Sequence, residues 1–178
     1  DLFETYVVTV GATMVLVLIY GVSGIDIGQF MLYPMAIGGV CLVASIVATY
    51  FVRLGASQNI MGALYKGFFG SAVISAVLLY PITSYVIGMD SQITVQNWTF
   101  TGGSLFICGI IGLVLTGLIV WVTEYYTSTN FRPVRSVAKS SETGHGTNVI
   151  QGLAVSMEAT AIPAVLICAA IIVTYQLA

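Results

Sequence analysis

Charged residues are what this sequence lacks most. Of its 178 residues, 7% are Asp, Glu, Lys or Arg and 58% are hydrophobic, and the mean hydropathy is +1.00. A soluble domain carries about 25% charged residues, which keep its surface hydrated. Because so few charges cannot cover a globular surface, we expect a lipid bilayer as the solvent. The five Lys and Arg residues form no basic groove, which excludes nucleic acid as an expected partner.

Cysteine and histidine are also scarce. The three cysteines, Cys41, Cys108 and Cys168, lie far apart, each inside an apolar run. This spacing fits neither a disulfide framework nor a zinc site, so we predict small apolar side chains within helices. The single histidine, His145, stands between two glycines without a nearby Cys or second His. We therefore predict a role in loop packing rather than in metal binding or catalysis.

Long hydrophobic runs are abundant. Four of them approach the roughly 20 residues that a helix needs to cross about 30 Å of hydrocarbon, and none alternates as a membrane strand does. A further run, Tyr6–Tyr20, reaches only about three-quarters of that length, so its missing part is expected before residue 1. We predict an all-α, polytopic transmembrane helical bundle of about five spans, cut from a larger protein. The expected spans are residues 1–20, 30–52, 68–88, 103–122 and 148–176, with cytoplasmic loops 53–67 and 123–147.

The basic residues fall in only two of the four links between these spans. They are Arg53 and Lys66 in one link, and Arg132, Arg135 and Lys139 in the other. Residues 21–29 and 89–102 contain no Lys or Arg. Because basic residues gather in cytoplasmic loops, both basic links are predicted to be cytoplasmic and the other two to lie outside. Within the longer basic link, Pro133 predicts the start of a short helix and Gly144 its end.

Two acidic residues open the sequence. Asp1 and Glu4 are three residues apart and so share a helical face. An ionised carboxylate at membrane depth costs about 2.5 kcal/mol or more, and such groups persist where they face a bundle interior, pair with a cation or carry ions. We therefore predict an ion-transport role for both, the alternative being that they solvate a helix end in a wet interface. Glu158 and Glu124 stand at span ends, where headgroup water is within reach.

Three stretches resemble the membrane-bound, ion-pumping pyrophosphatases. Residues 1–6 (DLFETY) resemble the sixth transmembrane helix of that family. Residues 123–130 (TEYYTSTN) resemble the cytoplasmic end of its ninth helix, and residues 143–154 (TGHGTNVIQGLA) resemble the approach to its tenth. The three stretches occur in the family's order and extend over the whole chain.

This resemblance implies a homodimeric pump in which hydrolysis of cytoplasmic pyrophosphate with magnesium drives ions outward. It implies that Asp1 belongs to the ion gate and that Glu4 helps to set which ion is carried. Protons are the expected ion, and Na+ is the alternative because sodium pumps share the glutamate position. The resemblance also makes residues 158–178 a candidate for the dimer interface. The expected location is the inner membrane of a prokaryotic cell.

The same resemblance places the aspartates that hold magnesium pyrophosphate outside these residues. In-line attack on a phosphoryl group needs several carboxylates that gather metal ions, and residues 68–175 offer no such cluster. No catalytic, cofactor-binding or metal-binding residue is therefore predicted here, and the fragment alone is not expected to be catalytic. Potassium dependence is decided elsewhere in the family. The alternatives are a non-enzymatic channel or transporter subunit, or a purely structural bundle.

Overall fold

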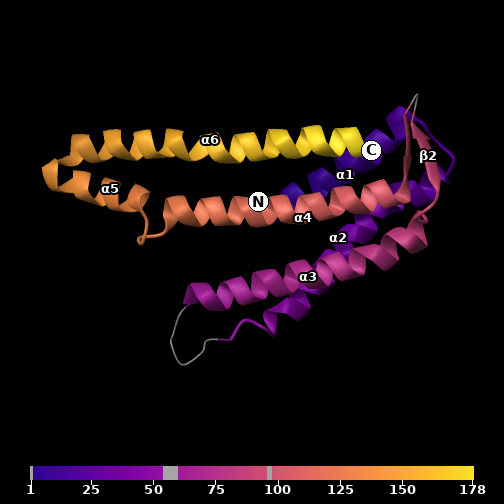
Figure 1. Cartoon of the computed structure of the whole chain (residues 1–178), viewed down its shortest axis with the longest axis horizontal. Helices are drawn as coiled ribbons and strands as arrows, with labels where there is room; N and C mark the ends of the chain where they lie inside the picture. Colours follow the sequence, from indigo (N-terminus) through magenta and orange to yellow (C-terminus); the bar gives the residue numbers. More distant parts are fainter. Residues whose placement is uncertain (1, 54–59, 96–97) are drawn as a thin grey trace. The chain divides into compact units, whose positions relative to one another are not determined.

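A computed structural model describes residues 2–53, 60–95 and 98–178, and most of them are helical (Figure 1). Five helices in these ranges are long and apolar enough to cross a membrane, which confirms the predicted all-α transmembrane architecture. They are α1 Leu2–Tyr20, α2 Ile27–Thr49, α3 Ile60–Val86, α4 Gly102–Thr127 and α6 His145–Leu177. The shorter elements are β1 Val22–Ser23, β2 Gln92–Val95, β3 Trp98–Thr101, α5 Arg132–Ser140 and the 3-10 helix η1 Ser141–Thr143.

The first helix is longer than its apolar run. It includes Glu4 and Thr5, and it has 19 residues. At a rise of about 1.5 Å per residue it spans about 28 Å, close to the thickness of the hydrocarbon layer. The helix therefore extends beyond the partial span that the apolar residues predicted, because one polar turn continues it.

Helices also extend into the links predicted to be cytoplasmic. α3 begins at Ile60, before the predicted start at Phe68, and α4 continues past Val122 to Thr127. The predicted loops 53–67 and 123–147 are thus partly helical. Polar residues such as Lys66 are good helix formers, so a helix does not end where its lipid-facing surface ends. α5 lies where the short helix was predicted, and Gly144, with φ +134°, separates η1 from α6.

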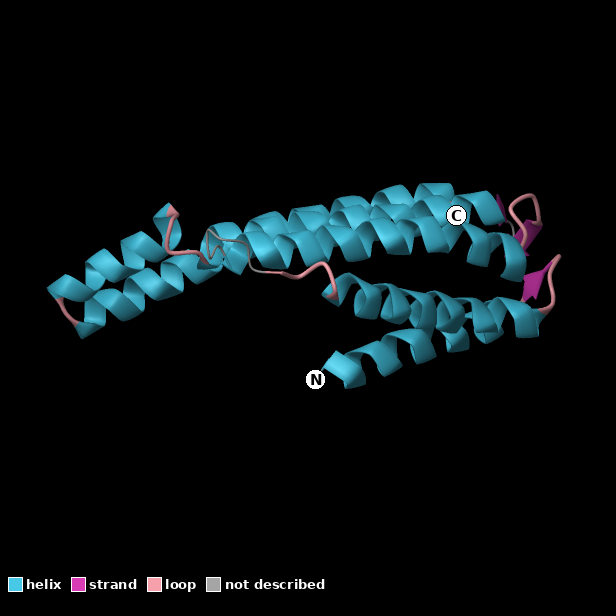
Figure 2. Ribbon diagram, turned by 90° about the horizontal axis from the view of Figure 1, so that it is seen from below, coloured by secondary structure: helices cyan, strands magenta, loops and turns pink. Residues whose placement is uncertain are grey.

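The two links predicted to lie outside pair with each other in a small sheet. Its strands are antiparallel and lie in the order β1-β2-β3, with Val22 opposite Val95 and Ile93 opposite Phe100. Figure 2 shows the strands at one end of the helices that they connect. Hydrogen-bonded strands must lie on one side of a membrane, so this pairing agrees with the alternation inferred from the basic residues.

Two glycines allow the close approach of chains around this sheet. Gly24 has φ +98°, and a Cβ added there would collide with the carbonyl oxygen of Gln92 in β2. A Cβ added at Gly102 would collide with the carbonyl oxygen of Gly88. A larger residue at either position would therefore push the sheet away from the helix ends.

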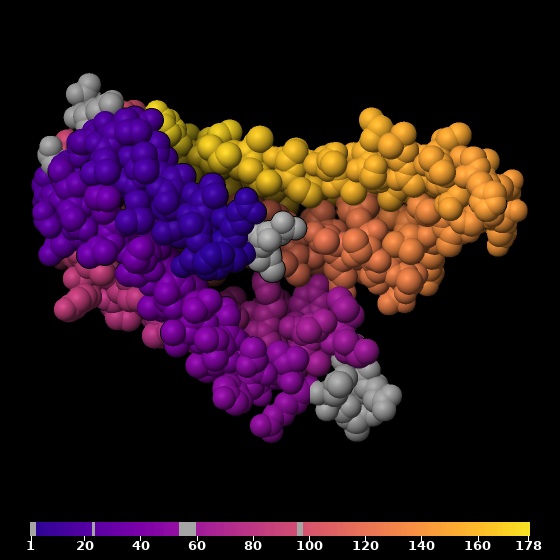
Figure 3. Space-filling model, turned by 180° about the vertical axis from the view of Figure 1, so that it is seen from behind, coloured from indigo at the N-terminus to yellow at the C-terminus, as the bar shows by residue number. Residues whose placement is uncertain are grey.

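Contacts within the chain define two compact units, residues 1–110 with 177–178, and residues 111–176. In the first unit α1 packs on α2 and α2 packs on α3, and Figure 3 shows the indigo side chains of α1 against purple α2. In the second unit α5 runs beside the start of α6 (Figures 1 and 2). There the Nε2 of Gln151 donates a hydrogen bond to the Oγ of Ser136 at 3.2 Å.

The buried core of the first unit is small and lies next to the sheet. Val22, Tyr33, Ile87 and Ile93 form it, and Ile93 is fully enclosed. The Tyr33 hydroxyl lies 2.9 Å from the Oγ1 of Thr83, so a buried hydrogen bond joins α2 to α3. This core holds together the ends of α2 and α3 that lie next to the sheet.

Candidate functional site

Glu4 lies near the start of α1 and is exposed, whereas Asp1 lies outside the described residues. The neighbouring Tyr6 points towards α2, where a Cβ added at Gly38 would collide with its hydroxyl. α1 thus packs on α2 through Tyr6, close to Glu4. The predicted pairing of Asp1 with Glu4 on one helical face remains a prediction.

The side of α1 that carries Glu4 is open. Gly11 follows Glu4 by two helical turns on nearly the same side, and a Cβ added there meets no heavy atom within 4 Å. Between Phe3 and Tyr20 no residue of α1 is buried. In a complete membrane protein this surface must contact lipid, water or further protein.

The hydroxyl groups of α1 bond to the helix itself. Thr9 donates from Oγ1 to the Thr5 carbonyl at 2.8 Å, and Thr13 donates to the Val10 carbonyl at 2.7 Å. By contrast, the Glu4 carboxylate has no hydrogen bond or ion pair with any residue in the described ranges. The helix backbone thus accepts the hydrogen bonds of both threonine hydroxyls. The Glu4 carboxylate, in contrast, needs water or further protein to solvate its charge.

Another carboxylate noted in the sequence, Glu158, has an aromatic neighbour. Glu158 is exposed on α6, and Tyr126 at the end of α4 lies close enough to it for a side-chain hydrogen bond. The sequence placed Glu158 at headgroup level but gave no sign of Tyr126 as its neighbour. Tyr126 near the end of α4 therefore neighbours the middle of α6, a proximity that the spacing of Glu158 did not predict.

The described residues offer no place for a catalytic metal. Among residues 2–53, 60–95 and 98–178, no group of three or more His, Cys, Asp and Glu side chains could hold a metal ion. His145 is the first residue of α6 and is exposed. These residues therefore do not fit a magnesium-pyrophosphate site.

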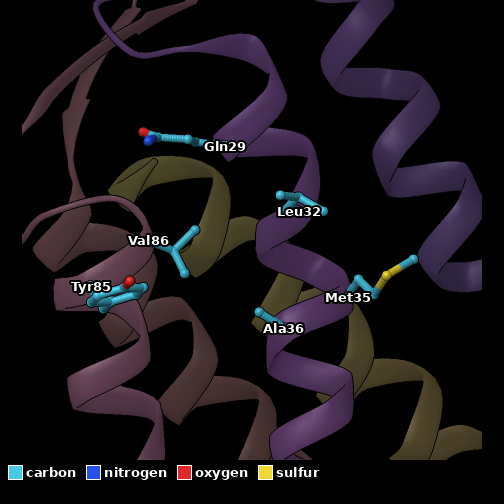
Figure 4. A pocket seen from close by; sticks show the side chains of 6 residues that line it. All are labelled: Gln29, Leu32, Met35, Ala36, Tyr85 and Val86. Carbon is cyan, nitrogen blue, oxygen red and sulfur yellow. The ribbon is translucent and has the colours of Figure 1, made fainter.

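A groove of about 440 Å³ lies between the start of α2 and the end of α3 (Figure 4). Its lining residues are mostly apolar, with one amide and one phenol. They are Gln29, Leu32, Met35, Ala36, Tyr85 and Val86. It holds no nucleophile, carboxylate or cation, so its lining supplies nothing for hydrolysis or ion binding.

Comparison with known proteins identifies the family. The model of the family described as inorganic H+ pyrophosphatase matches residues 1–178. The chain belongs to this family. The match confirms the resemblance drawn from residues 1–6, 123–130 and 143–154, and it extends over every helix described above.

Several relatives within the pyrophosphatase family are similar over most of the chain. The pyrophosphate-energized proton pump 2 of Mycoplana dimorpha is 57% identical over 83% of the chain and 71% of its own length. The pyrophosphate-energized proton pump of Anaplasma marginale is 57% identical over 67% of the chain and 85% of its own length. The K(+)-insensitive pyrophosphate-energized proton pump of Methanosarcina mazei is 42% identical over 98% of the chain, which spans only 24% of that relative.

Proposed function

We propose that this chain forms part of a pyrophosphate-energised proton pump in a prokaryotic cell membrane. The observation that carries the proposal is the family match over the whole chain, together with relatives named as such pumps. Five helices long enough to cross a membrane support it. The relatives' names favour this function over a non-enzymatic channel or transporter subunit.

Within the pump, we assign Glu4 and Asp1 to the ion path. An ionised carboxylate facing hydrocarbon costs about 2.5 kcal/mol or more, so the open side of α1 must be covered by protein or water in the complete pump. Glu4 has no described cation beside it, and a carboxylate of this kind can take up and release a proton. Asp1 joins the assignment because it lies three residues from Glu4 in the sequence.

The finer parts of the assignment follow the family resemblance. Magnesium would be held by parts of the pump outside the described residues, where several carboxylates can converge. A homodimer would use residues 158–178, almost all of them in α6, where Ile162, Val165 and Ile172 are exposed. Protons are the proposed ion, and Na+ is the outcome to test against them.

The test is a Glu4→Gln substitution in the complete pump, which keeps the side-chain size and removes the ionisable group. Inverted membrane vesicles receive pyrophosphate, and proton uptake and phosphate release are measured together. We expect proton uptake to fall at least about tenfold, which corresponds to raising the free-energy barrier of the transport step by about 1.4 kcal/mol. The number of protons moved per pyrophosphate hydrolysed should fall as well. Repeating the assay with labelled sodium identifies the ion.

Glu142→Gln is the matched control, because it removes another exposed carboxylate, on η1, without touching α1 or the proposed dimer interface. Proton uptake by this variant should stay close to that of the wild type. If Glu4→Gln pumps protons at the wild-type rate and ratio, Glu4 is not an ion carrier. If pyrophosphate drives no transport of either ion in the wild-type vesicles, the pump assignment itself is wrong.

A further inference from the structure

The short helix α5 carries three basic residues and no acidic residue. Arg132, Arg135 and Lys139 are spaced three and four residues apart, so they lie on one face of the helix. All three are exposed. We call these three residues the basic face of α5.

The opposite face of α5 packs against its own unit. Pro133 is buried, and with Val134 and Val137 it lines a cavity of about 340 Å³ that Tyr126 of α4 and Val155 of α6 also line. The hydrogen bond between Gln151 and Ser136 fixes α5 on the same side. The basic face therefore points away from α4 and α6.

No described acid neutralises the basic face. None of its three residues forms an ion pair within residues 2–53, 60–95 and 98–178. Arg135 is held by a hydrogen bond from its Nε to the Thr129 carbonyl at 3.1 Å, which leaves its terminal amino groups free to bind an anion. The next acid along the chain, Glu142, lies beyond the helix on η1. A surface with these charges fits an anionic partner.

Aromatic side chains show at which depth the basic face begins. Trp121 and Tyr125 are exposed at the end of α4, the position where aromatic residues mark the membrane–water boundary. The Phe131 ring lies 5.3 Å from the Tyr125 ring, so the chain is still at that level when α5 begins with Arg132. At about 1.5 Å per residue, Arg135 lies no more than about 5 Å further out. The headgroup layer is itself about 5–8 Å thick.

We propose that the basic face of α5 binds anionic phospholipid headgroups of the cytoplasmic leaflet. Arg132 and Arg135 lie within the headgroup layer, and the long side chain of Lys139 reaches its outer edge. Each basic residue near an anionic membrane surface contributes about 1 kcal/mol of attraction, which screening by salt reduces. Guanidinium groups suit this partner because they bind phosphate oxygens in pairs. The contact holds the link between α4 and α6 to the membrane surface, and it does not depend on pyrophosphate hydrolysis.

The test uses the complete pump in vesicles of phosphatidylcholine, with either spin-labelled phosphatidylglycerol or spin-labelled phosphatidylcholine as probe. Electron paramagnetic resonance gives the association constant of the anionic lipid relative to the neutral one. We expect the wild type to prefer phosphatidylglycerol. In R132Q/R135Q/K139Q, each charge removed should lower the relative association constant of phosphatidylglycerol by up to about fivefold. High salt should weaken the preference of the wild type and leave that of the triple variant unchanged.

R132K/R135K is the matched control, because it keeps both charges while changing the hydrogen-bond geometry of Arg135. This variant should keep the preference for the anionic lipid, and its elution from a sizing column should match the wild type. A triple variant that prefers phosphatidylglycerol as strongly as the wild type overturns the proposal. A wild type with no preference also overturns it, since other protein then covers the basic face. Phosphate release from pyrophosphate is measured in parallel, so a failure of the pump assignment is seen separately.

Discussion

The buried hydrogen bond between Tyr33 and Thr83 can be tested by removing one hydroxyl at a time. Thr83 donates its own hydrogen to the Leu79 carbonyl at 2.8 Å, so Tyr33 is the donor in their 2.9 Å bond. Thr83 is fully buried and Tyr33 is 7% exposed, which leaves no water to replace a lost partner. Thr83→Val keeps the side-chain shape and strands the Tyr33 hydroxyl. An unsatisfied buried group costs about 1–3 kcal/mol, but interhelical hydrogen bonds in membranes average about 0.6 kcal/mol, so we expect a loss of about 1 kcal/mol.

The assay is reversible unfolding of the complete pump in mixed micelles of detergent and sodium dodecyl sulfate. Tyr33→Phe removes the other hydroxyl, and Y33F/T83V removes both. In Y33F/T83V no hydroxyl is left without its hydrogen-bond partner, so the double variant should be no less stable than T83V alone. The coupling energy between the two substitutions should be about 0.6–1.7 kcal/mol. Thr83→Ser keeps the hydroxyl and serves as the control for side-chain volume. Strictly additive effects of the two single changes would show that the hydrogen bond does not join α2 to α3.

Two further predictions concern the outer sheet and the orientation of the chain. The double substitution Val22→Cys and Val95→Cys should form a disulfide on mild oxidation. Paired residues of antiparallel strands have Cα atoms about 4.5–5.5 Å apart, which suits a disulfide. Mass spectrometry of the digested protein would detect the cross-linked peptides. Recovery of only reduced peptides would contradict the β1–β2 pairing. Thr99→Cys should react with a membrane-impermeant maleimide from outside the cell and Arg132→Cys from the cytoplasmic side, both being exposed. Labelling of both from the same side would refute the inferred topology.

Apolar runs determined the helices reliably but not where they end. Residues 30–52 were predicted as a span, and α2 occupies Ile27–Thr49. A hydropathy pattern marks where a helix meets lipid, whereas the helix ends where backbone groups find other partners or a residue stops it. Gly144 is such a residue, and its position was predicted, because a left-handed φ favours glycine.

The sheet was not predicted from the sequence, and the reason is physical. β1 has only two residues between Gly21 and Gly24, too few to show any alternation of apolar and polar side chains. Its partner β2 lies far along the chain, and no local signal specifies that pairing. The contact of Tyr126 with Glu158 was missed for the same reason, since it depends on how α4 and α6 pack.

The candidate site was predicted from the cost of a charged side chain in a membrane helix more than from any spacing of residues. The cost of placing a carboxylate in a membrane helix singled out Glu4, and the structure places Glu4 on α1, exposed and with no described partner. Thr9 and Thr13 bond to carbonyls of their own helix, as helical threonines commonly do, whereas an ionised carboxylate has no hydrogen to donate in this way. The roles of Glu4 and Asp1 in the ion path both stay predictions.

The three-stranded sheet imposes an order on the synthesis of the protein. Val22 leaves the ribosome long before Val95, its partner across the sheet, so β1 has no strand to pair with when α1 and α2 enter the membrane. Water must satisfy its peptide groups until α3 has inserted and the hairpin of β2 and β3 has reached the same side of the membrane. Closure of the sheet therefore comes late in biogenesis, and it can occur only in a chain whose first three helices have inserted with the correct orientation.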